Sequence, residues 1–126
     1  MAQYTLRLYT DRLAPKSECR LSACNRVVYV REGDAILRSG GQAAGLAANS
    51  AWQGRDEAAV TSGAGGATLL RWELVADGRS PEAPARADLA SSLALAQAVE
   101  LSDPGGYLMR CDRVDFPLGG IAYTHV

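Results

Sequence analysis

The sequence predicts an all-β fold in which antiparallel strands form a barrel or sandwich. Strand-length hydrophobic runs recur between turn-forming residues, and nothing before residue 88 has the pattern of a long helix. Residues 27–31 contain three valines and a tyrosine, which suits a pleated, half-buried surface better than a helix. We therefore expect a barrel core over residues 1–76, a linker-like segment over 77–90 and C-terminal strands over 91–126.

Two strands are expected before the valine-rich segment. Residues 4–10 alternate between apolar and polar side chains, which places Leu6 and Leu8 on one face of an opening strand. Residues 18–24 predict a second strand with weaker alternation, and Pro15 lies in the connection before it.

A hairpin is predicted at the valine-rich segment. Its first strand covers residues 27–31, and residues 32–34 (Glu, Gly, Asp) tolerate a tight turn. The apolar run resumes at residues 35–37 and ends before the pair Gly40 and Gly41. These lengths fit a small antiparallel sheet.

The next part of the chain is rich in small residues. Residues 42–48 predict a strand, residues 49–54 a loop around Trp52, and residues 57–61 another short strand. Residues 62–66 contain three glycines and predict a flexible turn.

Residues 67–75 predict the strand that closes the barrel. Alternation is clean here, because Leu70, Trp72 and Leu74 share one face. We expect this face to point inward with Trp72 as a core anchor, and stacking of Trp72 on a ligand is the alternative.

The C-terminal part is expected to contain further strands. Alanines in residues 91–101 favour a helix, but leucines and a valine at even spacing favour the strand that we predict. Residues 107–116 predict another strand. Because residues 107–126 carry many apolar side chains, we expect them to pair with the barrel edge of the same chain or of a second copy, and so predict a homodimer.

The spacing around Gly33 resembles the first motif of the cupin superfamily, whose members are small β-barrels of the jelly-roll type. That motif runs Gly, five residues, His-x-His, three or four residues, Glu, six residues, Gly, and here Gly33 takes the last position while Arg26 stands at the metal-binding Glu. The two histidine positions fall on Cys19 and Leu21 or, with the shorter spacer, on Arg20 and Ser22. The resemblance therefore implies a degenerate cupin unit without metal ligands or a cofactor.

A second start of the same motif lies near the C-terminus. Gly119, five residues and His125 match its opening, and residues 11–15 loosely echo residues 112–117. The resemblance suggests the first half of a two-cupin protein. His125 would be a metal ligand only if this second motif were completed.

Composition argues against several classes of function. A net charge of −1 with 21% charged residues gives no global field that favours nucleic acid or membrane surfaces. The N-terminus lacks the apolar run of a signal peptide, so we expect a cytoplasmic protein. The three cysteines, Cys19, Cys24 and Cys111, have no metal-type spacing and are expected to be thiols that pack as small hydrophobic groups.

Arg26 is the main candidate functional residue. If the cupin spacing holds, its guanidinium points into the barrel, where a buried charge needs a partner. Either an internal carboxylate such as Glu18 or Glu73 pairs with it, or a small anionic molecule binds to it. Trp72 and Cys19 complete the candidate ligand-binding set.

Three functions stay open. The missing motif ligands favour a non-catalytic cupin-like domain that serves assembly or regulation. The second possibility is binding of a small anion in the barrel through Arg26, and the third is a metal-dependent enzyme completed by a partner or a second cupin unit. An enzyme is less favoured, because the chain has a single histidine and no catalytic residue can be assigned.

Overall fold

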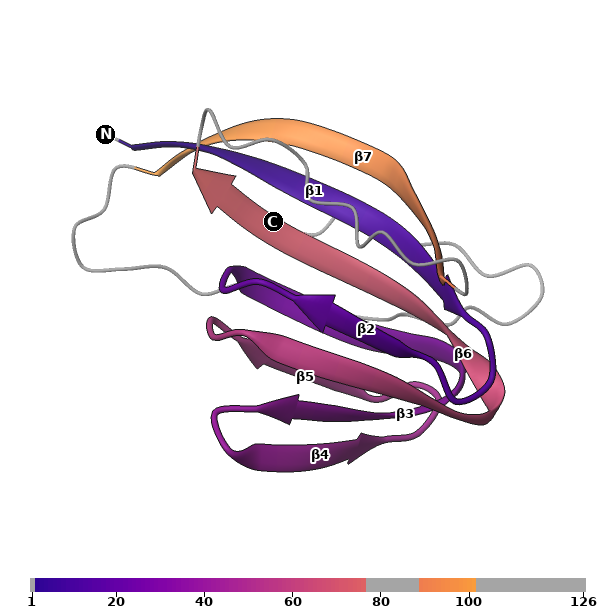
Figure 1. The fold of residues 1–126 in the computed structure, drawn as a ribbon. Coiled ribbons are helices and arrows are strands. Elements are labelled where there is room, and N and C mark those ends of the chain that lie inside the picture. The colour runs from indigo at the N-terminus through magenta and orange to yellow at the C-terminus, as the bar shows by residue number, and fades with distance from the viewer. Residues whose placement is uncertain (1, 77–88, 102–126) are drawn as a thin grey trace, which may run out of the picture.

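The computed structural model describes residues 2–76 and 89–101, which form seven strands and, within those ranges, no helix. In chain order the strands are β1 (Ala2–Leu13), β2 (Glu18–Leu21), β3 (Asn25–Ser39), β4 (Gln42–Leu46), β5 (Ala51–Gly54), β6 (Ala58–Ala76) and β7 (Leu89–Leu101). All strand pairs are antiparallel and form one sheet of order β4-β3-β6-β1-β7, with β2 beside β6 and β5 beside β3 (Figure 1). The predicted all-β antiparallel fold is confirmed.

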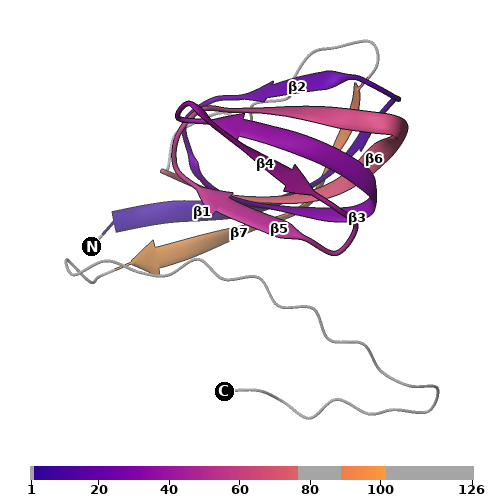
Figure 2. The same cartoon turned by 90° about the horizontal axis from the view of Figure 1, so that it is seen from below.

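The two longest strands, β3 and β6, run through both walls of the structure. The first half of β3 lies between β5 and the second half of β6, which in turn lies beside β1; β1 pairs with β7. We call this group of strands the first wall. The second half of β3 lies between β4 and the first half of β6, which pairs with β2, and these strands form the second wall. Figure 2 shows how the walls curl around a common interior.

Glycines allow β3 and β6 to bend where one wall meets the other. The register between these strands shifts at Val30/Glu32 and again at Gly33/Ala35. Gly33 and Gly66 have φ angles of 81° and 79°, in the left-handed region. A Cβ on Gly33 would run into the carbonyl oxygen of Gly66, so the two backbones touch at this corner. Strands commonly change walls through such bulges.

The prediction of a hairpin turn at residues 32–34 is wrong. The chain continues through them as one bulged 15-residue strand, β3. The hairpin turn lies instead at Gly40 and Gly41, whose φ angles of 58° and 78° fit the two-residue turn that joins β3 to β4.

Other sequence predictions have mixed outcomes. Strands are confirmed near the positions expected for β1, β2, β4 and β7. Residues 62–66, predicted as a turn, lie inside β6 at the corner, and residues 51–54, predicted as loop, form β5. The predictions for residues 77–88 and 102–126, including the strand at 107–116, Cys111 and His125, lie outside the described residues.

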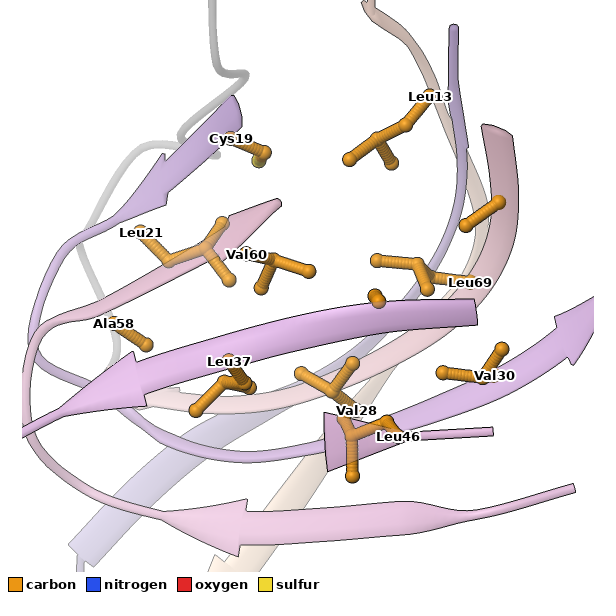
Figure 3. Packing of buried hydrophobic residues seen from close by; sticks show 12 residues of the cluster. Leu13, Cys19, Leu21, Val28, Val30, Leu37, Leu46, Ala58, Val60 and Leu69 are labelled. Atoms are coloured by element: carbon orange, nitrogen blue, oxygen red, sulfur yellow. The ribbon is translucent and has the colours of Figure 1, made fainter. Parts of the chain in front are cut away.

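The hydrophobic core fills the space between the walls near the corner. Val28 and Val30 of β3 and Val60 of β6 are fully buried there and belong to one cluster (Figure 3). The whole cluster consists of Leu13, Cys19, Leu21, Val28, Val30, Ala35, Leu37, Leu46, Ala58, Val60, Ala67 and Leu69. Removing this apolar surface from water stabilises the closed sheet.

The prediction that Trp72 anchors the core is wrong. Leu70, Trp72 and Leu74 do share a face, but Trp72 lies opposite Val27 and Leu8 on the outer side of the first wall and is half-buried. The buried residues of this part of β6 lie on the opposite face, and they include the charged residues Arg71 and Glu73. Trp52, from the unpredicted strand β5, packs against the core instead.

Gly33→Ala should destabilise the protein by about 3 kcal/mol, because an added Cβ would meet both an unfavourable φ and the backbone of Gly66. Gly45→Ala is the matched control: this glycine lies in β4, and a Cβ there meets no atom within 4 Å. Urea unfolding should therefore show a change within about 0.5 kcal/mol for the control. Equal stability of the two variants would contradict the close approach of the Gly33 and Gly66 backbones at the corner.

Candidate functional site

Polar side chains gather on the inner face of the first wall, farther from the corner than the hydrophobic core. Strand alternation brings them together, since Arg26 of β3 and Arg7 of β1 both lie opposite Glu73 of β6, and Tyr9 lies opposite Arg71. We call this set the inner polar cluster; it consists of Arg7, Tyr9, Asp11, Arg26, Arg71, Glu73 and Ser91.

Arg26 forms a buried ion pair with Glu73. Its Nε and Nη2 atoms lie 2.9 and 2.8 Å from the same carboxylate oxygen, Oε2, and the Arg26 side chain is only 1% exposed. Of the two carboxylates predicted as internal partners, Glu73 is therefore the one in contact. Glu18 pairs instead with Arg20, whose side chain is 82% exposed.

Arg71 connects this pair to the neighbouring strands. Its Nη1 lies 2.9 Å from Glu73 Oε2, and its Nε and Nη2 donate to the two oxygens of Asp11 at 2.7 and 3.1 Å. Two contacts of this fork-like kind fix both side chains in orientation. The hydroxyl of Ser91 in β7 donates to Asp11 Oδ1 at 2.6 Å, so the connected contacts link β3, β6, β1 and β7.

The environment holds Arg71 in its charged form. Burial lowers its pKa, but hydrogen bonds and charge attraction from Asp11 and Glu73 outweigh that effect and raise the pKa above its ordinary value. The ring of Tyr9 adds to this stabilisation, because the Arg71 guanidinium lies 4.0 Å from the ring centroid.

The inner polar cluster buries charged side chains of both signs. Three guanidiniums, of Arg7, Arg26 and Arg71, face two carboxylates, of Asp11 and Glu73, and no other charged side chain is buried among the described residues. In addition, Arg26 Nη1 and Tyr9 Oη are buried without a hydrogen-bond partner.

The three ligand-binding residues predicted from the sequence do not form one site. Arg26 belongs to the inner polar cluster, whereas Cys19 is buried in the hydrophobic core and Trp72 lies on the outer face. Sequence reasoning missed Arg7, Tyr9, Asp11, Arg71 and Ser91. The available signal was the strand at residues 67–75, where charged side chains alternate with apolar ones on opposite faces, so that one of the two faces must be charged.

Two surface hollows among the described residues lie away from this cluster. One, of about 520 Å³, opens near Arg20, Arg38 and Glu57, and another, of about 260 Å³, opens beside Trp52. Neither is lined by a member of the inner polar cluster. Within the described ranges, no three His, Cys, Asp or Glu side chains gather as a metal-binding group.

Comparisons with protein-family models, curated proteins and solved structures find no match to this chain. In the part of the chain that the structure describes, no helix has the length and apolar character needed to cross a membrane. The cupin resemblance therefore stays a prediction, and function has to be argued from the fold and the inner polar cluster.

Glu73→Ala should cost more stability than Arg26→Ala. Removing Glu73 takes a carboxylate partner from both Arg26 and Arg71 and should cost about 4–5 kcal/mol, whereas removing Arg26 leaves Glu73 paired with Arg71 and should cost on the order of 3 kcal/mol. Glu18→Ala, which removes the partner of an exposed arginine, is the control and should change stability by less than about 0.5 kcal/mol. A smaller loss of stability for Glu73→Ala than for Arg26→Ala in denaturant unfolding would contradict the role of Glu73 as the shared partner of two arginines.

Proposed function

We propose that this chain is a non-catalytic, cupin-like β-barrel domain that serves in assembly, and that it forms a homodimer through strand β7. The observation that carries the proposal is the exposed edge of β7. Among the described residues β7 pairs only with β1, and Figure 1 shows it at the outer side of the sheet.

The other edge strands are short, but β7 is long. In the described part of the chain β2, β4 and β5 have four or five residues, whereas β7 has 13. Short edges resist unwanted pairing, while a long edge presents a row of backbone donors and acceptors to another strand. This contrast supports β7 as the pairing surface.

The side chains of β7 fit contact with another strand. Leu93 and Leu95 are 48% and 50% exposed, and the strand contains no lysine, arginine or proline to discourage pairing. A bulge places Leu95 opposite Leu8 and Leu93 opposite Tyr9, so one exposed leucine lies on each of the two faces of the first wall. Apolar groups exposed on both faces of an edge strand favour a partner that continues the sheet.

A second copy of the chain is the partner that this edge fits best. Two β7 strands related by a two-fold axis run antiparallel, as β7 already does with β1, and each copy satisfies the edge of the other. Closed two-fold pairing also leaves no long edge for further addition. An assembly of this kind requires no cofactor.

The interior chemistry supports a non-catalytic role. Arg26 stands where the cupin resemblance places a carboxylate metal ligand, and its guanidinium is held there by Glu73. A fixed positive charge at this position opposes binding of a metal cation. The inner polar cluster then contributes to structure instead of to a reaction.

Lysines on β7 should dissociate the dimer. Leu95 and Gln97 are exposed, and Leu95→Lys with Gln97→Lys brings like charges together across the two-fold axis. We expect the dimer dissociation constant, measured by sedimentation at micromolar concentration, to rise about 100-fold or more, which corresponds to roughly 3 kcal/mol. Ile36→Lys with Ala48→Lys adds the same charge at exposed positions away from β7 and should leave the constant unchanged.

The oligomeric state of the wild-type protein in the same sedimentation experiment tests the proposal directly. A monomer at all concentrations tested, or equal dissociation by the control pair, would contradict assembly through β7. In the monomer case the edge would be covered within the chain.

A further inference from the structure

Two arginines lie in one row on the outer face of the second wall. Arg20 of β2 and Arg38 of β3 are both opposite Ala59, because β6 pairs with both strands. The residues next to them, Leu21 and Leu37, are buried in the core, so both arginine side chains point outward. Strands in a sheet are about 4.8 Å apart, so the two arginine backbones are about 10 Å apart with only a methyl side chain between them.

A surface hollow of about 520 Å³ opens at this row. Both arginines and Ala59 line it, together with Gly40 and Gly41 of the turn between β3 and β4. This volume lies within the range of pockets that bind small organic molecules, about 300–1,000 Å³. The register of three strands and the shape of the surface therefore bring the two guanidinium groups to one hollow.

Both guanidinium groups keep donors for a ligand. Arg20 donates from Nε to Glu18 at 2.7 Å, and its Nη1 and Nη2 groups have no partner among the described residues. Arg38 is exposed and forms no ion pair within the described ranges. A guanidinium group can only donate and stays charged at physiological pH. The hollow therefore presents donors from two sides.

The turn between β3 and β4 adds backbone donors and is held in place. The strand pairing ends at Ser39 and Gln42, so the N–H groups of Gly40 and Gly41 lie outside the ladder. The hydroxyl of Ser39 donates to the carbonyl oxygen of Glu57 at 2.7 Å, which fixes the turn against the start of β6. A hollow whose walls are already connected loses little freedom when a ligand binds.

The geometry of the donors favours phosphate over carboxylate. A carboxylate has two oxygens, which one guanidinium fork can satisfy. A phosphate monoester has three terminal oxygens and a charge of about −1.5 to −2 at pH 7, so it can accept from arginines on both sides. Two flanking guanidinium groups match this shape and charge better than they match a carboxylate.

Glu57 restricts where the anionic group lies. Its side chain also lines the hollow, but it precedes Ala59 by two residues, which is about 7 Å in an extended chain. We propose that this hollow binds a small phosphate monoester, with its phosphate group between Arg20 and Arg38 and directed away from Glu57. The site lies on the second wall and is independent of the β7 edge and of the proposed dimer.

Calorimetric titration of the full chain with glycerol phosphate at constant ionic strength tests the site. Arg20→Gln and Arg38→Gln should each raise the dissociation constant about tenfold or more, because charge-assisted hydrogen bonds are lost. Arg31→Gln is the matched control: it removes an exposed arginine from the same strand as Arg38 but outside the hollow, and should change the constant by less than about twofold. No binding to the wild type, or equal weakening by the control, would overturn the proposal.

Two further titrations test the ligand class and its placement. Acetate should bind the wild type at least about tenfold more weakly than glycerol phosphate, since it can use only one of the two guanidinium forks. Equal affinity would overturn the assignment to phosphate. Glu57→Gln should tighten binding of glycerol phosphate about threefold, because a like charge is removed from the hollow. Weaker binding by this variant would contradict the proposed placement.

Backbone amide shifts locate the bound phosphate. In the wild-type protein, glycerol phosphate should cause the largest chemical-shift changes at Ala59, Gly40 and Gly41, which line the hollow. Largest changes on the first wall, or changes spread evenly over the exposed arginines, would overturn the site.

Discussion

The buried contacts from Arg26 through Glu73 and Arg71 to Asp11 determine how the first wall can form. A buried charge without a partner costs several kcal/mol, so these side chains are tolerated only when all of them face inward together. A shift of one residue in β6 would turn its charges outward and bring Leu70, Trp72 and Leu74 inside. The ion pairs therefore select one register among pairings that apolar packing alone would allow.

The corner and the inner polar cluster divide the interior into two parts. Near Gly33 and Gly66 the backbones of β3 and β6 bend and approach each other closely, and aliphatic side chains fill the space between the walls. Farther along β6 the interior becomes charged, and hydrogen bonds replace apolar packing. The first part contains the hydrophobic core, while the ion pairs and hydrogen bonds of the second part connect β3, β6, β1 and β7.

The sequence predicted the fold class because alternation and turn residues are local signals. The strand over residues 91–101 was predicted, and pairing of Arg26 with an internal carboxylate was one of the two alternatives considered. The role of Gly33 was not, because a positive φ serves a turn and a bulge equally well, and only the position of β6 distinguishes them. The inner face of β6 was misassigned for a related reason: apolar residues were taken to point inward, but this strand buries Arg71 and Glu73 and leaves Trp72 half-buried.

A double-mutant cycle on Asp11 and Arg71 tests most directly whether buried ion pairs hold the first wall together. Asp11→Leu and Arg71→Met each leave a charged partner behind, so each should cost about 3–5 kcal/mol, while the double variant replaces the pair with apolar groups. We expect the double variant to lose about 3 kcal/mol less stability than the two single variants lose together, as measured by denaturant unfolding. Additive costs, with a coupling energy near zero, would show that the two side chains do not meet in the barrel interior and would contradict the account.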